Sequence, residues 1–141
     1  MNDKLKTLLK FALDQKKHSK CEDKKTSAVL ISHDCMQIYS IGINGGPRGG
    51  TNCLCDKCHA HEKYSCVHAE MNCLVKNTHI DDEPKILISS KQPCAMCASL
   101  MVNAGTNIKK VYYNEPYWDG TGLRILRDAG IETIQFDEVE L

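Results

Sequence analysis

The sequence predicts an α/β fold whose sheet contains parallel crossovers. Two observations lead to this prediction: short apolar segments typical of strands are present, and they alternate with segments of helical periodicity. The chain has 141 residues, of which 42% are hydrophobic, so its size and composition suit one domain with an ordinary core. We therefore expect residues 1–141 to form a single domain.

The first half of the chain is expected to hold one helix and a hairpin. Apolar residues recur with helical spacing from Leu5 to Leu13, which predicts a helix over roughly residues 3–17. Residues 28–31 are apolar throughout and predict a buried strand, and residues 37–43 alternate as its hairpin partner should. The Gly/Pro-rich segment 44–50 interrupts regular structure, and a Cys/His-rich loop insertion of about 51–65 follows.

The second half alternates helix and strand. Helices are predicted at residues 68–76, 93–104 and 121–129, and strands at residues 85–89, 110–113 and 131–136. Pro93 suits the first turn of its helix, where the missing N–H has no partner to lose, and Gly105 suits the stop. In the first of these helices we expect Met71, Leu74 and Val75 to face inward.

Charge and composition argue against several partners. The 18 basic and 18 acidic residues balance, and no basic tract suited to a long nucleic acid is evident, which favours a small substrate. No apolar run has the length of a membrane span. The leucines near the N-terminus are interrupted by Lys4 and Lys6, unlike a signal peptide, so we expect a cytoplasmic protein, in the host cytoplasm if the source is viral.

Nine cysteines are a high and odd number for a chain of this length. A secreted scaffold would pair them in disulfides, but the sequence has no export signal. Metal ligation in a reducing compartment explains the cysteines better.

One set of residues combines metal ligands with a carboxylate: His68-Ala69-Glu70, followed by Pro93-Cys94 and Cys97. One imidazole and two thiolates leave a tetrahedral zinc one ligand short, so a water can complete the site. Zinc lowers the pKa of such a water to about 7. Glu70 is two residues from His68 and can carry protons without binding the metal. We expect both helix N-termini to meet at one sheet edge, where their dipoles favour thiolates.

Each half of this pattern has a simpler interpretation when it stands alone. A C-x-x-C pair is often a redox centre or half of a structural zinc site, and an isolated H-x-E carries almost no information. Their combination in this order, with a helix and a strand between them, favours a catalytic zinc. Cys94-Ala-Met-Cys97 also lacks the Trp-Cys context of a thioredoxin-like motif.

These motifs resemble the H-x-E…P-C-x-x-C signature of zinc-dependent nucleobase deaminases and hence the cytidine deaminase superfamily. The resemblance covers nearly the whole chain and narrows to the phage-type deoxycytidylate (dCMP) deaminases. The narrower match lies in residues 19–21, 42–49, 104–105 and 112–131. It implies a three-layer α/β/α cytidine-deaminase-like fold with a central mixed five-stranded sheet.

The resemblance also implies an activity, the zinc-dependent hydrolysis of dCMP to dUMP and ammonia, which supplies dUMP for thymidylate synthesis. His68, Cys94 and Cys97 would hold the zinc, and Glu70 would move protons from water to pyrimidine N3 and the leaving amine. Family members are commonly hexamers that dCTP activates and dTTP inhibits, and Mg²⁺ would accompany such an effector.

The resemblance places substrate contacts at Asn44, Ala69 and Tyr117. Asn44 would contact the sugar and Tyr117 would lie near the nucleotide, although an ordinary turn residue and a packing aromatic are the alternatives. The phosphate must meet cations or backbone amides. The sequence offers three candidates that it does not rank, each of which is otherwise a solvated surface charge: Lys20, Arg48 and Arg124.

The segment Cys53–His61 places five potential metal ligands within nine residues. Phage-type enzymes use a second, structural zinc, and a closed four-ligand site would fix this loop. The matching ligands here are Cys21, Cys53 and Cys66, with Cys58 as the fourth. The substitutes are Cys55, His59 and His61. The alternative is a loop that binds metal adventitiously.

Three other functions compete with this prediction. A tRNA adenosine deaminase shares the zinc motif, but the balanced charge, the Asn44–Gly50 loop and the absence of a basic C-terminal helix oppose it. A riboflavin-pathway deaminase would have extra residues between its cysteines. The non-enzymatic alternative is a zinc-stabilised nucleic-acid-binding module that uses Cys53–His61, and it would need no equivalent of Glu70.

Overall fold

The computed structural model describes residues 1–21, 24–49 and 66–141. The elements along the chain are α1 (Asp3–Asp14), the 3₁₀ helix η1 (Gln15–His18), β1 (Ser27–Ser32), β2 (Ile38–Ile43), α3 (Ala69–Lys76), β3 (Lys85–Lys91), α4 (Ala95–Asn103), β4 (Ile108–Glu115), α5 (Thr121–Asp128), β5 (Glu132–Gln135) and the 3₁₀ helix η3 (Glu138–Glu140). The Cys/His-rich loop predicted at 51–65 lies outside the described residues.

The strands form one mixed sheet with the order β2-β1-β3-β4-β5. β1 is antiparallel to both β2 and β3, whereas β3, β4 and β5 are parallel to one another. β2 therefore runs in the same direction as β3, with β1 between them. The predicted hairpin, parallel crossovers and five-stranded mixed sheet are confirmed.

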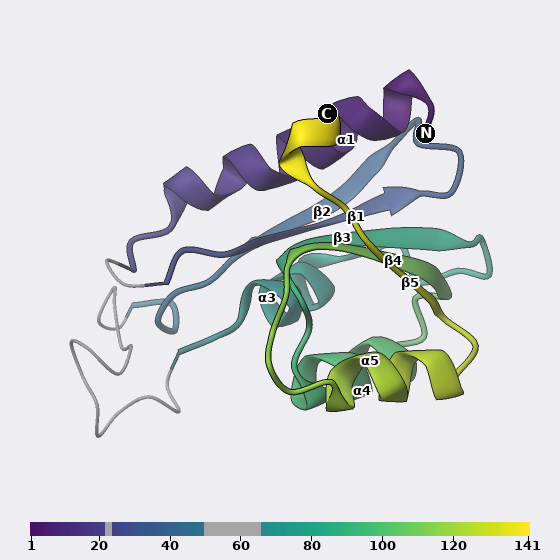
Figure 1. Cartoon of the computed structure of the whole chain (residues 1–141). Helices are drawn as coiled ribbons and strands as arrows, with labels where there is room; N and C mark the ends of the chain where they lie inside the picture. Colours follow the sequence, from purple (N-terminus) through teal and green to yellow (C-terminus); the bar gives the residue numbers. More distant parts are fainter. Residues whose placement is uncertain (22–23, 50–65) are drawn as a thin grey trace.

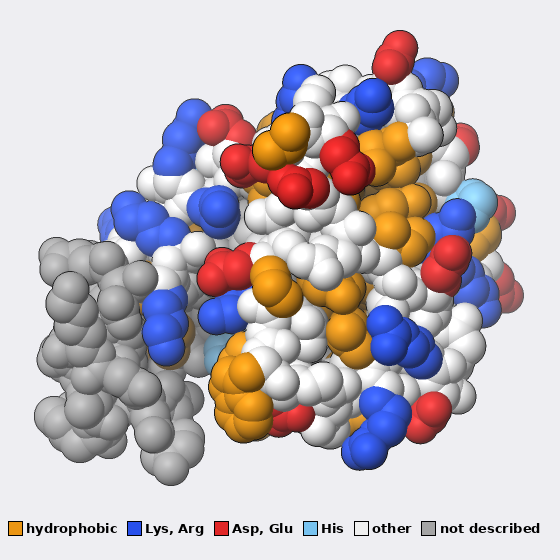
Figure 2. Space-filling model, viewed as in Figure 1, with side chains coloured by type: hydrophobic (Ala, Val, Ile, Leu, Met, Phe, Trp, Pro, Cys, Tyr) orange, Lys and Arg blue, Asp and Glu red, His pale blue; other side chains and the backbone are white. Residues whose placement is uncertain are grey.

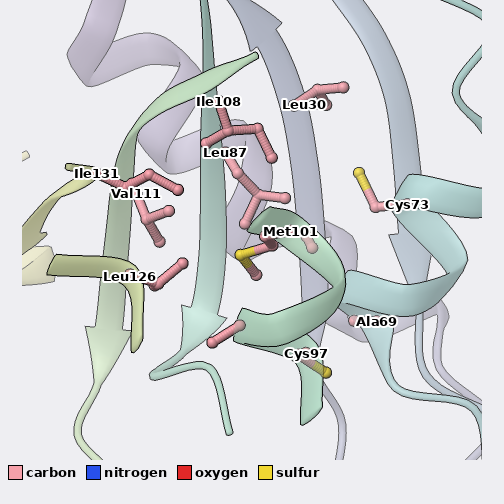
Figure 3. Packing of buried hydrophobic residues seen from close by; sticks show 12 residues of the cluster. Leu30, Ala69, Cys73, Leu87, Cys97, Met101, Ile108, Val111, Leu126 and Ile131 are labelled. Carbon is pink, nitrogen blue, oxygen red and sulfur yellow. The ribbon is translucent and has the colours of Figure 1, made fainter. Parts of the chain in front are cut away.

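Helices cover both faces of the sheet, which gives three layers (Figure 1). α1 packs on one face against Val29 and Ile31 of β1. Leu30 points to the other face and joins Leu87 and Met101 in the cluster between the sheet and the helices α3, α4 and α5, which Figure 3 shows. Because both faces of β1 are covered, its sequence is apolar without alternation. The predicted three-layer α/β/α architecture is confirmed.

Two predictions about the helices were wrong. α4 starts at Ala95 with Cys94 as its N-cap, so Pro93 precedes the helix and does not lie in its first turn. Val75 is 82% exposed, because the buried side of α3 is centred on Ala69 and Cys73 and a residue two positions beyond Cys73 lies about 200° away. None of the described helices is both long and apolar enough to cross a membrane.

Gly42 allows α3 to lie directly on β2. A Cβ atom at position 42 would lie 2.0 Å from the carbonyl oxygen of Ala69 and 2.4 Å from the backbone nitrogen of Cys73. Both are backbone atoms of α3, so no side-chain rotation relieves the overlap. The close approach holds the start of α3 against the end of β2.

We expect Gly42→Ala to lower the free energy of unfolding by about 3 kcal/mol, since overpacking here moves a whole helix. Urea unfolding of the zinc-loaded protein measures this. Gly120→Ala is the matched control, because a Cβ at position 120 meets no atom within 4 Å. Its effect should stay below about 1 kcal/mol. Equal losses in the two variants would contradict the proposed close packing.

Candidate active site

The site lies where two strands of the same direction end. β2 leads towards α3, whose N-cap is His68, and β3 leads directly into α4, whose N-cap is Cys94. Carboxyl ends of strands that run in the same direction meet at one sheet edge. The two helix N-termini therefore converge there, as the alternation of elements predicted.

A second close approach fixes the start of α4. A Cβ atom at Gly122 of α5 would lie 2.2 Å from the carbonyl oxygen of Pro93. α5 thus packs directly on the segment that carries Cys94, just as β2 packs directly on α3. Both helix starts are held by backbone packing.

Three potential metal ligands meet at these helix starts. The Nδ1 atom of His68 lies 3.4 Å from the Sγ of Cys97 and 3.6 Å from the Sγ of Cys94. All three ligand atoms lie within 4.8 Å of one another. Within residues 1–21, 24–49 and 66–141, these three side chains are the one group of three or more His, Cys, Asp or Glu residues whose spacing suits a metal ion.

The spacing of the three atoms fits zinc. Zinc–sulfur bonds of about 2.3 Å and zinc–nitrogen bonds of about 2.0–2.1 Å, set at a tetrahedral angle, would place nitrogen and sulfur about 3.5 Å apart. The two observed separations lie on either side of that value. One imidazole and two thiols also leave a fourth position open, as in catalytic zinc sites.

The cluster stabilises negative charge on sulfur. Hydrogen bonds from Cys97 and His68 lower the pKa of Cys94 to about 3. The same contact with Cys94 raises the pKa of the Cys97 thiol, and the hydrogen bond to Cys94 raises the pKa of His68. The site is therefore prepared to receive a cation.

Glu70 is the buried carboxyl group beside these ligands. It is 6% exposed, and this burial raises its pKa. Its Oε1 accepts a hydrogen bond of 2.9 Å from the Ser89 hydroxyl, which also lies 2.6 Å from the carbonyl oxygen of Lys91. A buried carboxyl group whose pKa is raised by burial, and which one hydrogen bond orients, suits the transfer of protons.

A cavity of about 250 Å³ opens over the cluster. Its described lining residues come from both halves of the chain: Cys21, Lys24, Thr26, Asn44, Cys66, His68, Glu70, Lys91, Gln92, Cys94 and Tyr117. The structure thus brings Asn44 and Tyr117, predicted to be near the substrate, to the same space as the metal ligands. Cys21 and Cys66, predicted as structural ligands, also line it.

Asn44 is held by the segment that precedes β1. Its Oδ1 accepts hydrogen bonds from the Ser19 hydroxyl at 2.8 Å and from the backbone N–H of Thr26 at 2.9 Å. Its Nδ2 donates to the carbonyl oxygen of Lys24 at 2.5 Å. An amide nitrogen has two N–H donors, so one N–H of Asn44 is left for a ligand, as far as the described residues show.

We expect Asn44→Ala to weaken catalysis and folding together, because the buried Ser19 hydroxyl and the Thr26 N–H would lose their acceptor. The free energy of unfolding should fall by about 1–3 kcal/mol, and KM for dCMP, the substrate that the family resemblance implies, should rise. Urea unfolding and steady-state kinetics measure the two effects. Asn114→Ala is the control, since the Asn114 amide bonds the carbonyl oxygen of Phe136 outside the cavity. A higher KM in the control would contradict the assignment.

Several residues predicted to contact the substrate are not among the described residues that line this cavity. Lys20, Arg48 and Arg124 are exposed and are not among the residues that line the cavity. Ala69 is fully buried at the start of α3 and does not line it either. Cys53 and Cys58, with the substitutes Cys55, His59 and His61, lie outside the described residues.

Two lysines that line the cavity were not among the site residues predicted from the sequence. The predicted strand stopped at Ser89, but β3 continues to Lys91 and brings that side chain to the cavity. The other is Lys24, which the sequence does not distinguish from the neighbouring Lys25. The available signal was the position of Lys91 itself, immediately before the Gln92-Pro93-Cys94 metal segment.

Known proteins are similar to this chain in sequence and in fold. Residues 2–115 match the family model of the cytidine and deoxycytidylate deaminase zinc-binding region. The deoxycytidylate deaminase of Schizosaccharomyces pombe is 29% identical over 132 residues. That alignment covers 85% of this chain, and the chain spans 40% of the length of this curated relative.

Among solved structures, the dCMP deaminase of cyanophage S-TIM5, in complex with dCMP and dUMP, is similar with a TM-score of 0.83 and 29% identity. The similarity covers 96% of this chain and 99% of the cyanophage chain. RibD of Acinetobacter baumannii shares the fold, with a TM-score of 0.68 and 21% identity over 94% of this chain and 35% of its own. The family match spans most of the sequence and includes all three clustered ligands, and the chain therefore belongs to the cytidine and deoxycytidylate deaminase family.

Proposed function

We propose that this protein catalyses the zinc-dependent hydrolytic deamination of dCMP to dUMP and ammonia. The observation that carries the proposal is the cluster of His68, Cys94 and Cys97 beside the cavity that His68, Cys94 and the buried carboxyl group of Glu70 line. The similarity to a cyanophage dCMP deaminase along nearly its full length supports this substrate.

Each residue of the site has a separate role in the proposed reaction. His68, Cys94 and Cys97 would hold the zinc, which when bound makes water a nucleophile at neutral pH. Glu70 would take a proton from the water that attacks C4 and deliver protons to N3 and to the leaving amine. The C4–O bond would form first, as N3 is protonated, and the C4–N bond would then break as the amine is protonated and leaves as ammonia. Ser89 keeps the Glu70 carboxyl in position.

The charge pattern of the surface supports a small substrate. Acidic and basic side chains are interspersed on the face that Figure 2 shows. A long nucleic acid would instead favour a continuous basic surface. The cavity is also of a size suited to a small molecule.

A substrate panel tests the proposal. The zinc-loaded protein should deaminate dCMP with a higher kcat/KM than CMP, deoxycytidine, dCTP or an adenosine-bearing RNA stem-loop. Release of ammonia and the ultraviolet change from cytosine to uracil measure turnover. A preference for deoxycytidine would contradict the nucleotide assignment, and a preference for the RNA would favour an adenosine deaminase.

A second, structural zinc is part of the proposal. Cys21 and Cys66 line one cavity, which supports their sharing a metal with Cys53 and Cys58. We expect a zinc-to-protein ratio near two, falling towards one in Cys66→Ser. Cys35→Ser is the control and should keep the ratio of the parent. Metal analysis by mass spectrometry checks this, and a ratio near one in the parent would contradict the second site.

Assembly and regulation remain predictions from the family resemblance. We expect a hexamer, activation by dCTP with Mg²⁺ and inhibition by dTTP, in a cytoplasmic enzyme. Light scattering after size exclusion measures the assembly, and initial rates with each nucleotide measure regulation. A monomer that neither nucleotide affects would contradict these predictions.

A further inference from the structure

We infer that Lys91, together with Lys24, binds the 5′-phosphate of the substrate and so makes the enzyme prefer a nucleotide to a nucleoside. This inference rests on the proposed function, since it assigns one part of dCMP to one part of the cavity. It replaces the three cations suggested by the sequence, which do not line that cavity.

The charges of the cavity favour an anion away from the metal ligands. Among its described lining residues, Lys24 and Lys91 are the ammonium groups and Glu70 is the carboxyl group. Neither lysine forms an ion pair with any carboxylate in the described parts of the chain. Two cations that have no counterion among the described residues, and that face one small cavity, attract a phosphate monoester.

The lining side chains differ in solvent exposure between the Glu70 side of the cavity and the lysine side. Glu70 is buried, whereas Lys91 is half-buried and Lys24 is exposed. A ligand whose reacting base meets Glu70 would therefore place its most hydrated group near the lysines. The polarity of a nucleoside monophosphate, with an uncharged base and a dianionic phosphate, matches this gradient.

Lys91 is held in position before any ligand binds. It lies at the end of β3 and its Nζ is 5.5 Å from the centroid of the Tyr117 ring. Gln92 holds the backbone that carries this ring: its Oε1 accepts a hydrogen bond of 3.1 Å from the backbone N–H of Tyr117, and its Nε2 donates to the carbonyl oxygen of Asp119 at 3.2 Å. The aromatic face thus orients the ammonium group without neutralising its charge.

The backbone of Lys24 is fixed by two contacts at the cavity. Its N–H donates to the Sγ of Cys21 at 3.3 Å, and its carbonyl oxygen accepts from Asn44. Lys25, the next residue, is exposed and does not line the cavity. The two neighbours therefore form a matched pair, one inside the proposed phosphate site and one outside it.

Equilibrium binding of the product separates phosphate recognition from chemistry. On the zinc-loaded protein, calorimetry with dUMP and with deoxyuridine gives the contribution of the phosphate. We expect Lys91→Gln to weaken dUMP binding about tenfold to a hundredfold, as for other hydrogen bonds to charged groups. Deoxyuridine binding should change far less. Lys24→Gln should act in the same direction, and Lys25→Gln should behave as the parent.

Turnover gives a second measure. The ratio of kcat/KM for dCMP to kcat/KM for deoxycytidine should fall in Lys91→Gln by the factor seen in binding, and inorganic phosphate should inhibit the parent more than the variant. Zinc content and thermal unfolding establish that the variant is folded. An unchanged ratio, or equal losses for nucleotide and nucleoside, would overturn the phosphate assignment.

The two proposals fail in different experiments. If the dCMP assignment is wrong, the unmodified protein itself will turn over another substrate faster than dCMP. If the phosphate assignment is wrong, the unmodified protein will prefer dCMP and dUMP, and Lys91→Gln will keep that preference. A parent that binds dUMP no better than deoxyuridine would overturn both.

Discussion

Glu70→Gln is expected to lower kcat for dCMP by about 10³-fold while the protein keeps its zinc and its fold. The amide has the shape of the carboxyl group, and the Ser89 hydroxyl, which donates to Oε1, can still donate to the amide oxygen. The amide cannot accept and return a proton, so the chemical step loses its carrier. Stopped-flow or steady-state turnover measures the loss, and metal analysis measures the zinc.

The stability of this variant separates a catalytic role from a structural one. Burial disfavours the ionised carboxyl group of Glu70, which is why its pKa is raised. A neutral amide avoids that penalty, so the free energy of unfolding should not fall. Glu138→Gln, at an exposed position of η3, is the control and should keep full activity. Turnover by Glu70→Gln within about tenfold of the parent would refute the proton-carrier role.

Removal of the metal should have the other large effect. Dialysis against a chelator should abolish turnover and lower the thermal midpoint, because binding energy at a formed site adds to folding energy. Restoring zinc should recover both. Cys94→Ser should show no measurable turnover and should lose one zinc per chain, since its thiol contacts His68 and Cys97 in the cluster.

A cysteine outside the site provides the control. Cys35 lies in the turn after β1, with a positive φ of 64°, and Cys35→Ser should keep the zinc content and activity of the parent. Activity that survives complete chelation, with zinc below about a tenth of an equivalent by metal analysis, would contradict a metal-dependent reaction. Full zinc content in Cys94→Ser would remove Cys94 from the ligand set.

The sequence predicted the framework well because strong local patterns specify it. The ligand cluster forms because two helices begin after strands that run in the same direction. The strands and the H-x-E and C-x-x-C spacings can all be identified in the sequence. These features depend on residues close together in the sequence and on fixed spacings, so they can be predicted without knowledge of the packing. The parallel crossovers followed from the same alternation of elements, whereas the mixed five-stranded sheet and its two covered faces were implied by the family resemblance.

The rest depended on long-range packing. Val75 is apolar like a core residue, but the side of α3 that is buried depends on how the helix packs on β2 at Gly42. From the sequence, Lys91 would be expected at a solvent-exposed strand end. It lies at the cavity because the segment around Tyr117, whose backbone N–H bonds Gln92, packs beside it. Arg48 had suitable charge for phosphate, but charge alone does not place a side chain.

The antiparallel β1, inserted between β2 and β3, has a consequence for how the chain acquires its ion. His68 follows the N-terminal hairpin and the two thiols follow β3, so the donors are separated by 26 and 29 positions along the chain. They become neighbours only after the hairpin has docked on the βαβ portion. Tight coordination at this site would thus come late in folding.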